Sequence, residues 1–153
     1  QEIGKVGMSG IAEGSHLHFE VRLGKATYSS YKRSLNPELW LAPHQDKNGQ
    51  LNGALAGRFL NVYDTNLEMP EMVLEYLPDG PEQPAGNSAE AFEIHLVTYE
   101  EKTLIGQSPW QESFAIGDLP PGWYRLNYPH DGLQQLLVQI FPGQLTMVTV
   151  QFE

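Results

Sequence analysis

The stretch that organises the chain is Phe114-Ala115-Ile116-Gly117-Asp118-Leu119-Pro120-Pro121-Gly122-Trp123-Tyr124-Arg125-Leu126. Two prolines fix the backbone angle φ in succession, and the glycine that follows accepts conformations closed to other residues. On both sides of this turn apolar residues alternate with others, which is the pattern of a half-buried strand. The stretch therefore predicts a tight reversal between a strand at 110–116 and a strand at 123–128.

The same alternation extends outward through the C-terminal two thirds of the chain. Short apolar-alternating runs are bounded by Gly, Pro and Asn, with no helical period between them. They predict seven strands, at 54–63, 71–77, 92–99, 110–116, 123–128, 134–141 and 145–152. Seven short strands of this kind predict an all-β fold with a β-sandwich over residues 53–153. The polar segment 78–91 is predicted to be a mobile loop.

With its Pro-Pro-Gly turn, this region resembles the transthyretin-like modules that are also called carboxypeptidase regulatory-like domains. The resemblance covers about residues 53–153 and implies a prealbumin-like, seven-stranded sandwich with an accessory role. Trp110, Trp123 and the tyrosines offer two interpretations. They pack in the sandwich or cover its ends, or they form a platform on which sugar rings stack.

Composition and charge limit the function classes. The chain has 153 residues, 41% of them hydrophobic, no Cys and a net charge of -10. Residues 1–43 carry five Lys/Arg against four Asp/Glu, whereas residues 44–153 carry four against fifteen. An acidic surface repels phosphate backbones, so nucleic acid is not an expected partner, and no apolar run approaches the roughly 20 residues that span a bilayer.

The change in charge balance near residue 44 indicates a boundary between two segments. Residues 44–52 are polar with an Asn48-Gly49 turn signal, and we interpret them as a linker in which His44 is solvated. Asp46 and Asn48 before Gly49 resemble part of a calcium loop, but the remaining acidic ligands are missing, so a turn is favoured.

The N-terminal segment, residues 1–43, contains Gly14-Ser15-His16-Leu17-His18-Phe19-Glu20-Val21-Arg22. A strand over 16–23 would direct Leu17, Phe19 and Val21 to one face, and the two histidines, Glu20 and Arg22 to the other. A glycine-rich strand at 3–10 is its predicted hairpin partner, and 25–33 is predicted as a loop. Asn36 and Pro37 predict a short, capped turn of helix that ends before Pro43.

Three runs together resemble the C-terminal end of a lysostaphin-type zinc endopeptidase, a bacterial cell-wall hydrolase. They are Gly4-x-x-Gly7-x-Ser9-Gly10, the run Gly14-Ser15-His16-Leu17-His18-Phe19-Glu20-Val21, and Asn36-Pro37-Glu38-x-Trp40-Leu41. The resemblance implies a remnant β-hairpin of a peptidase domain. It makes His18 a zinc ligand and His16 the catalytic imidazole beside it. Glu20 shares their face and is a candidate partner for an imidazole ring.

A catalytic zinc needs about three protein ligands and an open position. The resembled family supplies the others from an upstream His-x-x-x-Asp and a further upstream His, and nothing of that kind precedes His16. The downstream His44, His95 and His130 lie in no matching motif. We therefore expect a fragment of a longer zinc enzyme that begins within a fold, holds no stable zinc by itself and cleaves no peptide alone.

Two hypotheses follow. In the first, the chain is the C-terminal part of a secreted or periplasmic zinc metalloendopeptidase that hydrolyses peptide bonds in peptidoglycan. In the second, it is a non-enzymatic cell-envelope binding module whose peptidase-like hairpin is only structural. In either case unpaired edge strands and Leu17, Phe19 and Val21 need cover, either from the sandwich or by self-association with another copy.

Overall fold

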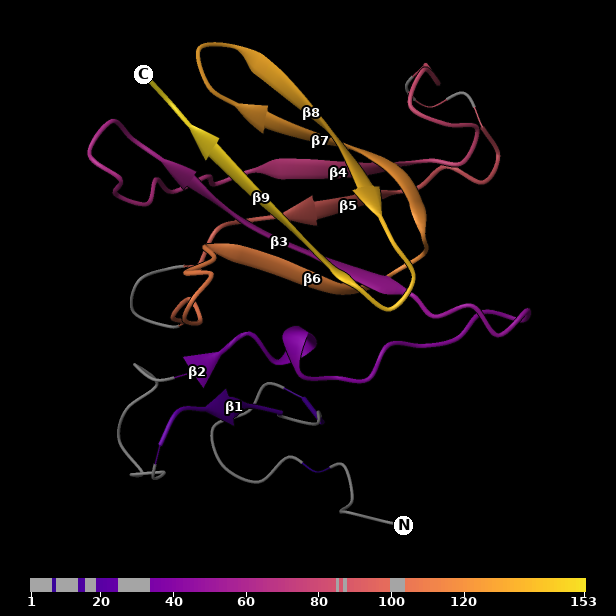
Figure 1. Ribbon diagram of the computed structural model, residues 1–153, viewed down its shortest axis with the longest axis horizontal. Coiled ribbons are helices and arrows are strands. Elements are labelled where there is room, and N and C mark those ends of the chain that lie inside the picture. The colour runs from indigo at the N-terminus through magenta and orange to yellow at the C-terminus, as the bar shows by residue number, and fades with distance from the viewer. Residues whose placement is uncertain are drawn as a thin grey trace.

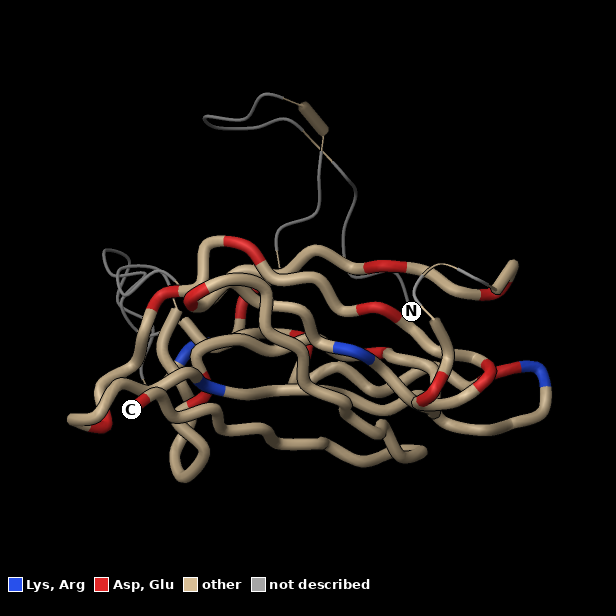
Figure 2. Tube along the Cα trace, turned by 90° about the horizontal axis from the view of Figure 1, so that it is seen from above, with Lys and Arg blue, Asp and Glu red and all other residues tan. Residues whose placement is uncertain are grey.

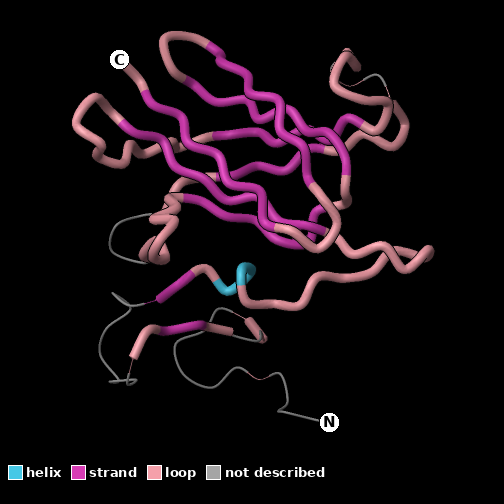
Figure 3. Tube along the Cα trace, viewed as in Figure 1, coloured by secondary structure: helices cyan, strands magenta, loops and turns pink. Residues whose placement is uncertain are grey.

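Strands make up nearly all of the regular structure in the computed structural model (Figures 1 and 3). It describes residues 7, 14–15, 19–24, 34–84, 86, 88–99 and 104–153. The C-terminal strands are β3 (Gly53–Leu60), β4 (Met72–Leu77), β5 (Glu93–Leu96), β6 (Phe114–Leu119), β7 (Gly122–Pro129), β8 (Leu133–Ile140) and β9 (Leu145–Gln151). Each corresponds to one predicted strand, so the prediction of an all-β sandwich is confirmed.

The seven strands divide into two sheets. One has the order β6-β3-β9 and the other the order β5-β4-β7-β8. All neighbours are antiparallel except β3 and β9, which run parallel from Ala54 beside Leu145 to Leu60 beside Gln151. The first and last strands of the sandwich therefore lie side by side, although about ninety residues separate them in sequence.

Alternating side chains from both sheets fill the space between them. Leu55 and Phe59 of β3, Leu74 of β4, and Tyr124 and Leu126 of β7 are each 0% exposed. The centroid of the Phe59 ring lies 5.0 to 6.1 Å from the rings of three other aromatic residues, Phe114, Tyr128 and Phe152. Such contacts add to the free energy gained by removing apolar area from water.

Gly57 lets the Phe114 ring lie directly over the centre of β3. A Cβ atom at Gly57 would lie 2.7 Å from Phe114 Cζ and 2.5 Å from Val148 Cγ2, closer than nonbonded carbon atoms approach. The missing side chain therefore makes room for the ring that packs against Phe59.

The Pro-Pro-Gly turn carries the chain from one sheet to the other. It joins β6 of the three-stranded sheet to β7 of the four-stranded sheet, and Tyr124 Oη donates to Pro120 O at 2.7 Å. Burial raises the pKa of Tyr124, so its hydroxyl stays protonated and keeps donating. The strand predicted at 110–116 begins at Phe114 and continues to Leu119, because the preceding residues form a turn and Gly53 pairs with Leu119.

A buried ion pair anchors the segment 78–91 to the outer face of the four-stranded sheet. Arg125 and Glu75 are opposite each other on β7 and β4, and Arg125 Nη1 donates to Glu75 Oε2 at 2.9 Å. Arg125 also donates to Gln83 O at 2.7 Å, and Gly86 N donates to Glu75 Oε1 at 2.9 Å. Composition predicted this segment to be loop but gave no sign that Gln83 would be buried.

Among its described residues, the N-terminal segment forms one small sheet and one helical turn. Strand β1 (Val21–Arg22) pairs antiparallel with β2 (Ser34–Leu35), and the 3-10 helix η2 spans Pro37–Leu39. Asn36 caps η2 by accepting from Glu38 N at 3.0 Å, which confirms the predicted capped turn. Apart from Gly7, the predicted strand at 3–10 lies outside the described residues, as does the predicted loop at 25–33.

Residues 34–43 pack on the sandwich along β6. Asn36 Nδ2 donates to Ala115 O at 3.0 Å, Ile105 N donates to Ser34 O at 2.9 Å, and Leu35 is 1% exposed. The residues predicted as a linker are likewise tied to the sandwich, because Gly143 N donates to Asn52 O at 3.0 Å. Asp46 Oδ1 accepts from Asn48 N and Gln50 N, which confirms the turn.

Candidate functional site

The two histidines that the family resemblance assigns to zinc chemistry, His16 and His18, lie outside the described residues. Their neighbour Glu20 is described, and its carboxylate pairs with Arg22 Nε. This contact agrees with the prediction that Glu20 and Arg22 share one face of the strand. On the other face Phe19 is 54% exposed, which agrees with the expected need for cover.

A zinc site cannot be assembled from the described residues alone. No three His, Asp or Glu side chains among them group closely enough to hold a metal ion. Of the histidines without a matching motif, His95 is exposed on β5 and His130 stacks on Phe152 with 3.5 Å between ring centroids. Within that part of the chain, the residues present do not fit a catalytic zinc.

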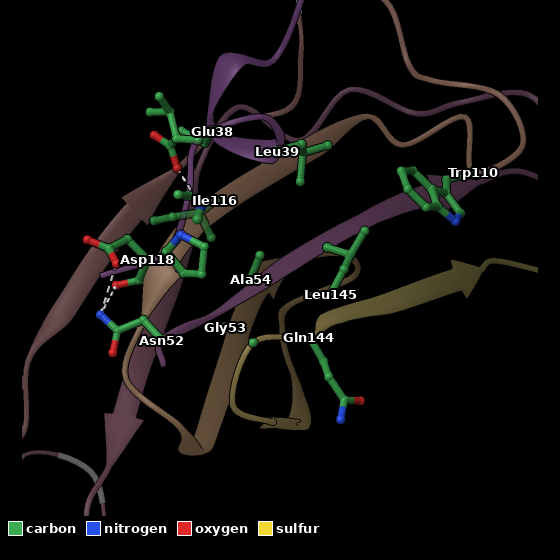
Figure 4. Close-up of a pocket in the computed structure, with 15 residues that line it drawn as sticks. Glu38, Leu39, Asn52, Gly53, Ala54, Trp110, Ile116, Asp118, Gln144 and Leu145 are labelled. Carbon is green, nitrogen blue, oxygen red and sulfur yellow. Dashed lines mark hydrogen bonds between the residues drawn. The ribbon is translucent and has the colours of Figure 1, made fainter. Parts of the chain in front are cut away.

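A hollow lies between the N-terminal segment and the three-stranded sheet (Figure 4). It has a volume of about 490 Å³, within the range of about 300–1,000 Å³ typical of small-molecule sites. Its apolar lining comes from three parts of the chain. These are Leu39, Leu41, Ala42 and Pro43 beside η2, Trp110 before β6, and Ala54, Ile116 and Leu145 of the sheet.

Two carboxylates stand at one end of this pocket, and Trp110 stands at the other (Figure 4). Glu38 accepts a hydrogen bond from Gly117 N. A Cβ atom at Gly117 would lie 3.0 Å from Glu38 O, so the glycine allows η2 to lie close against β6. The position of Glu38 at the pocket thus depends on a contact between residues 79 positions apart.

Asp118 is held in place by residues of the predicted linker. Its Oδ1 accepts from His44 N at 2.9 Å and from Asn52 Nδ2 at 3.0 Å, and Oδ2 contacts His44 Nδ1. Burial by itself would raise the pKa of Asp118, but the hydrogen bonds from His44 and Asn52 outweigh it and lower the pKa. Asp118 is therefore ionised at neutral pH. The predicted exposure of His44 is confirmed, at 83% of its side chain.

The aromatic residues divide between the two interpretations that the sequence left open. Tyr124 and Tyr128 are buried in the core, as the packing interpretation predicts. Trp110 is 40% exposed and lines the pocket, so it offers an accessible ring. Sequence reasoning singled out Trp110 but missed Glu38 and Asp118, because only the packing of distant segments brings them to the same pocket.

A second group of polar residues lies buried beside β2 and the start of β6. Glu112 is 1% exposed, and its Oε2 accepts from Gln107 N at 2.8 Å. Within the described part of the chain, four buried side-chain atoms here have no hydrogen-bond partner: Ser34 Oγ, Tyr99 Oη, Gln107 Nε2 and Glu112 Oε1. Burial raises the pKa of Glu112 and of Tyr99, so both favour the protonated form.

Comparison with protein-family models and with curated proteins found no match to this chain. Among the described residues, no helix is long and apolar enough to span a membrane. Acidic residues are distributed along the whole sandwich and far outnumber basic ones (Figure 2).

Proposed function

We propose that the chain is the C-terminal part of a zinc metalloendopeptidase that hydrolyses peptide bonds in bacterial peptidoglycan. The observation that carries the proposal is the run Gly14-Ser15-His16-Leu17-His18-Phe19-Glu20-Val21 with its upstream glycine spacing. The capped turn that opens at Asn36 and Pro37 supports the match downstream. Because this polymer lies outside the cell membrane, a secreted or periplasmic location follows from the proposal.

In this proposal His18 is a metal ligand and His16 is the catalytic imidazole. When bound, zinc would lower the pKa of its coordinated water to about 7. The imidazole of His16, with an ordinary pKa near 6.5, suits proton transfer at neutral pH. The remaining ligands belong to a segment upstream of Gln1 in the longer protein, so residues 1–153 are proposed to be inactive by themselves.

The sandwich is proposed to be an accessory module that stabilises or orients the peptidase part. Contacts between the two regions support this role, because Asn36 and Glu38 each bond to a residue of β6, as does His44 of the linker. Five residues of the N-terminal segment also line the pocket: Glu38, Leu39, Leu41, Ala42 and Pro43.

The direct test uses the protein extended upstream to include a His-x-x-x-Asp segment. Zinc is measured by mass spectrometry of the purified protein, and cleavage by release of amino groups from purified peptidoglycan. We expect His18→Ala to lose zinc, and His16→Ala to keep zinc and lose turnover. A His16→Ala enzyme with a normal rate would remove His16 from the mechanism, and cleavage by residues 1–153 alone would contradict the proposed inactivity.

A second candidate function is a non-enzymatic cell-envelope binding module. The pocket with its exposed Trp110 favours it, because a preformed apolar cavity is suited to ligand binding. The two candidates differ in metal content. Stoichiometric zinc together with peptidoglycan cleavage in the extended protein excludes the binding module, whereas a full-length protein that lacks an upstream ligand pair favours it.

A further inference from the structure

We infer that the pocket between η2 and the three-stranded sheet binds a peptide through a lysine-type side chain, with its alkyl stem on the apolar floor and its ammonium group between Glu38 and Asp118. The inference does not rest on the proposed peptidase activity, because it is argued from described residues that line the pocket and uses neither His16 nor His18.

The floor of the pocket suits an unbranched alkyl chain. Ala54 and Leu145 are neighbours on β3 and β9, and Leu39 lies across from them on η2 (Figure 4). Trp110 closes the end remote from the carboxylates and offers a ring face for an apolar neighbouring residue. Lysine side chains commonly lay their methylene groups along such surfaces while the charged end reaches polar groups.

The negative charge at one end of the pocket favours a positively charged ligand. Glu38 and Asp118 both line one end, and none of the lining residues in the described part of the chain is Lys or Arg. A carboxylate has about four acceptor sites. One amide N–H occupies one of them on Glu38, and His44 and Asn52 occupy three on Asp118, so both carboxylates can still accept from an ammonium group. Asp118 keeps its negative charge at neutral pH because of its hydrogen bonds to His44 and Asn52. The net charge of -10 also draws cations toward the chain.

A neutral sugar is the competing occupant, since Trp110 alone would suit it. A sugar offers hydroxyl groups to the carboxylates but no opposite charge. The ammonium group is therefore the feature that separates the two occupants, and the test is built on it.

The test is an NMR titration of the uniformly ¹⁵N-labelled chain, residues 1–153. The probe is the peptide acetyl-Leu-Lys-Ala-amide, and the matched control replaces its lysine with norleucine, which keeps the stem and removes the charge. Trp110→Phe assigns the Trp110 indole signal among the three tryptophans. We expect saturable shifts at the Trp110 indole and at the Gly117 and Asp118 amides, with the norleucine peptide at least about fivefold weaker.

Two single variants test whether the lysine peptide binds at this pocket. Glu38→Gln removes a charge but keeps an oxygen that accepts from Gly117 N, and we expect about threefold weaker binding of the lysine peptide. Glu93→Gln is the matched control, because Glu93 is an exposed acid on β5 of the other sheet, and its affinity is expected to be unchanged.

Three results would overturn the inference. They are equal binding of the lysine and norleucine peptides, equal shifts with an oligomer of N-acetylglucosamine, and no shift at the Trp110 indole at about 10 mM lysine peptide.

Discussion

The N-terminal segment carries the most recognisable sequence motif, whereas the sandwich contains the hydrophobic core. Residues 1–43 carry the His-x-His motif, and their described strands, β1 and β2, contain two residues each. The sandwich has strands of four to eight residues and encloses the hydrophobic core. A pair of strands as short as β1 and β2 is marginal in isolation. The described strands of the N-terminal segment therefore need contacts with the sandwich to be stable.

The N-terminal segment contacts the sandwich through a few residues beside β6. Ser34, Leu35 and Asn36 are buried, whereas Phe19 and Leu23 are exposed. Among the described residues of the N-terminal segment, those next to β6 are therefore the buried ones. The following predictions test this division, from the largest expected effect to the smallest.

Phe59→Ala should break the sandwich most severely. Its ring is 0% exposed among three aromatic residues, and deleting such a side chain leaves a cavity. We expect a loss of about 3–5 kcal/mol in the free energy of unfolding, measured in urea. Tyr63→Ala, at an 84% exposed position soon after β3, is the control and should change stability by less than about 0.5 kcal/mol. Equal losses would mean that the core is not where the structure places it.

Arg125→Met should destabilise the sandwich by about 3 kcal/mol, because it leaves the Glu75 carboxylate buried without its charged partner. Hydrogen exchange at Gly86 should also become faster, since Gly86 N donates to Glu75. Adding Glu75→Gln to this variant removes the unpaired buried charge and should restore most of the stability. A double variant as unstable as the single one would show that packing, and not charge, dominates at this position.

Asn36→Ala tests the junction between the two regions. It removes the cap of η2 and the hydrogen bond to Ala115 O, and we expect a loss of about 1 kcal/mol. Hydrogen exchange should become faster over residues 34–43 while β4 and β7 stay protected. Asn61→Ala is matched to it, because Asn61 Oδ1 also accepts backbone N–H groups, but in the loop after β3. In Asn61→Ala, the faster hydrogen exchange should be confined to that loop.

Glu112→Gln should have the smallest effect, visible in the pH dependence of stability. Burial raises the folded-state pKa of Glu112 above its ordinary value of 4.5. Its contribution therefore favours folding most below pH 4.5 and is lost as the pH rises through the raised folded-state pKa. Glutamine should remove this slope and leave the variant relatively more stable at pH 7 than at pH 4.5. An equal difference from wild type at both pH values would contradict the raised pKa.

The strands could be predicted because each pattern is local. Met72, Leu74 and Tyr76 alternate within one run, and Pro120, Pro121 and Gly122 mark the turn without reference to the rest of the chain. The start of β6 was predicted four residues too early, because the turn before it depends on the bond from Gln107 N to the Glu112 side chain. The candidate pocket was not predictable, since Glu38, Trp110 and Asp118 share no sequence pattern.

The sequence by itself determined the all-β class, the seven strands, the capped turn at Asn36 and the motif on which the peptidase proposal rests. Each of these depends on neighbours within a few residues, where backbone geometry and side-chain alternation act directly. Only the tertiary structure decided that β3 and β9 run parallel, that Arg125 pairs with the buried Glu75, and that Glu38 and Asp118 line the same pocket. These features arise because burying apolar area brings distant segments together, and the partners of a buried polar group are known only when that packing is known.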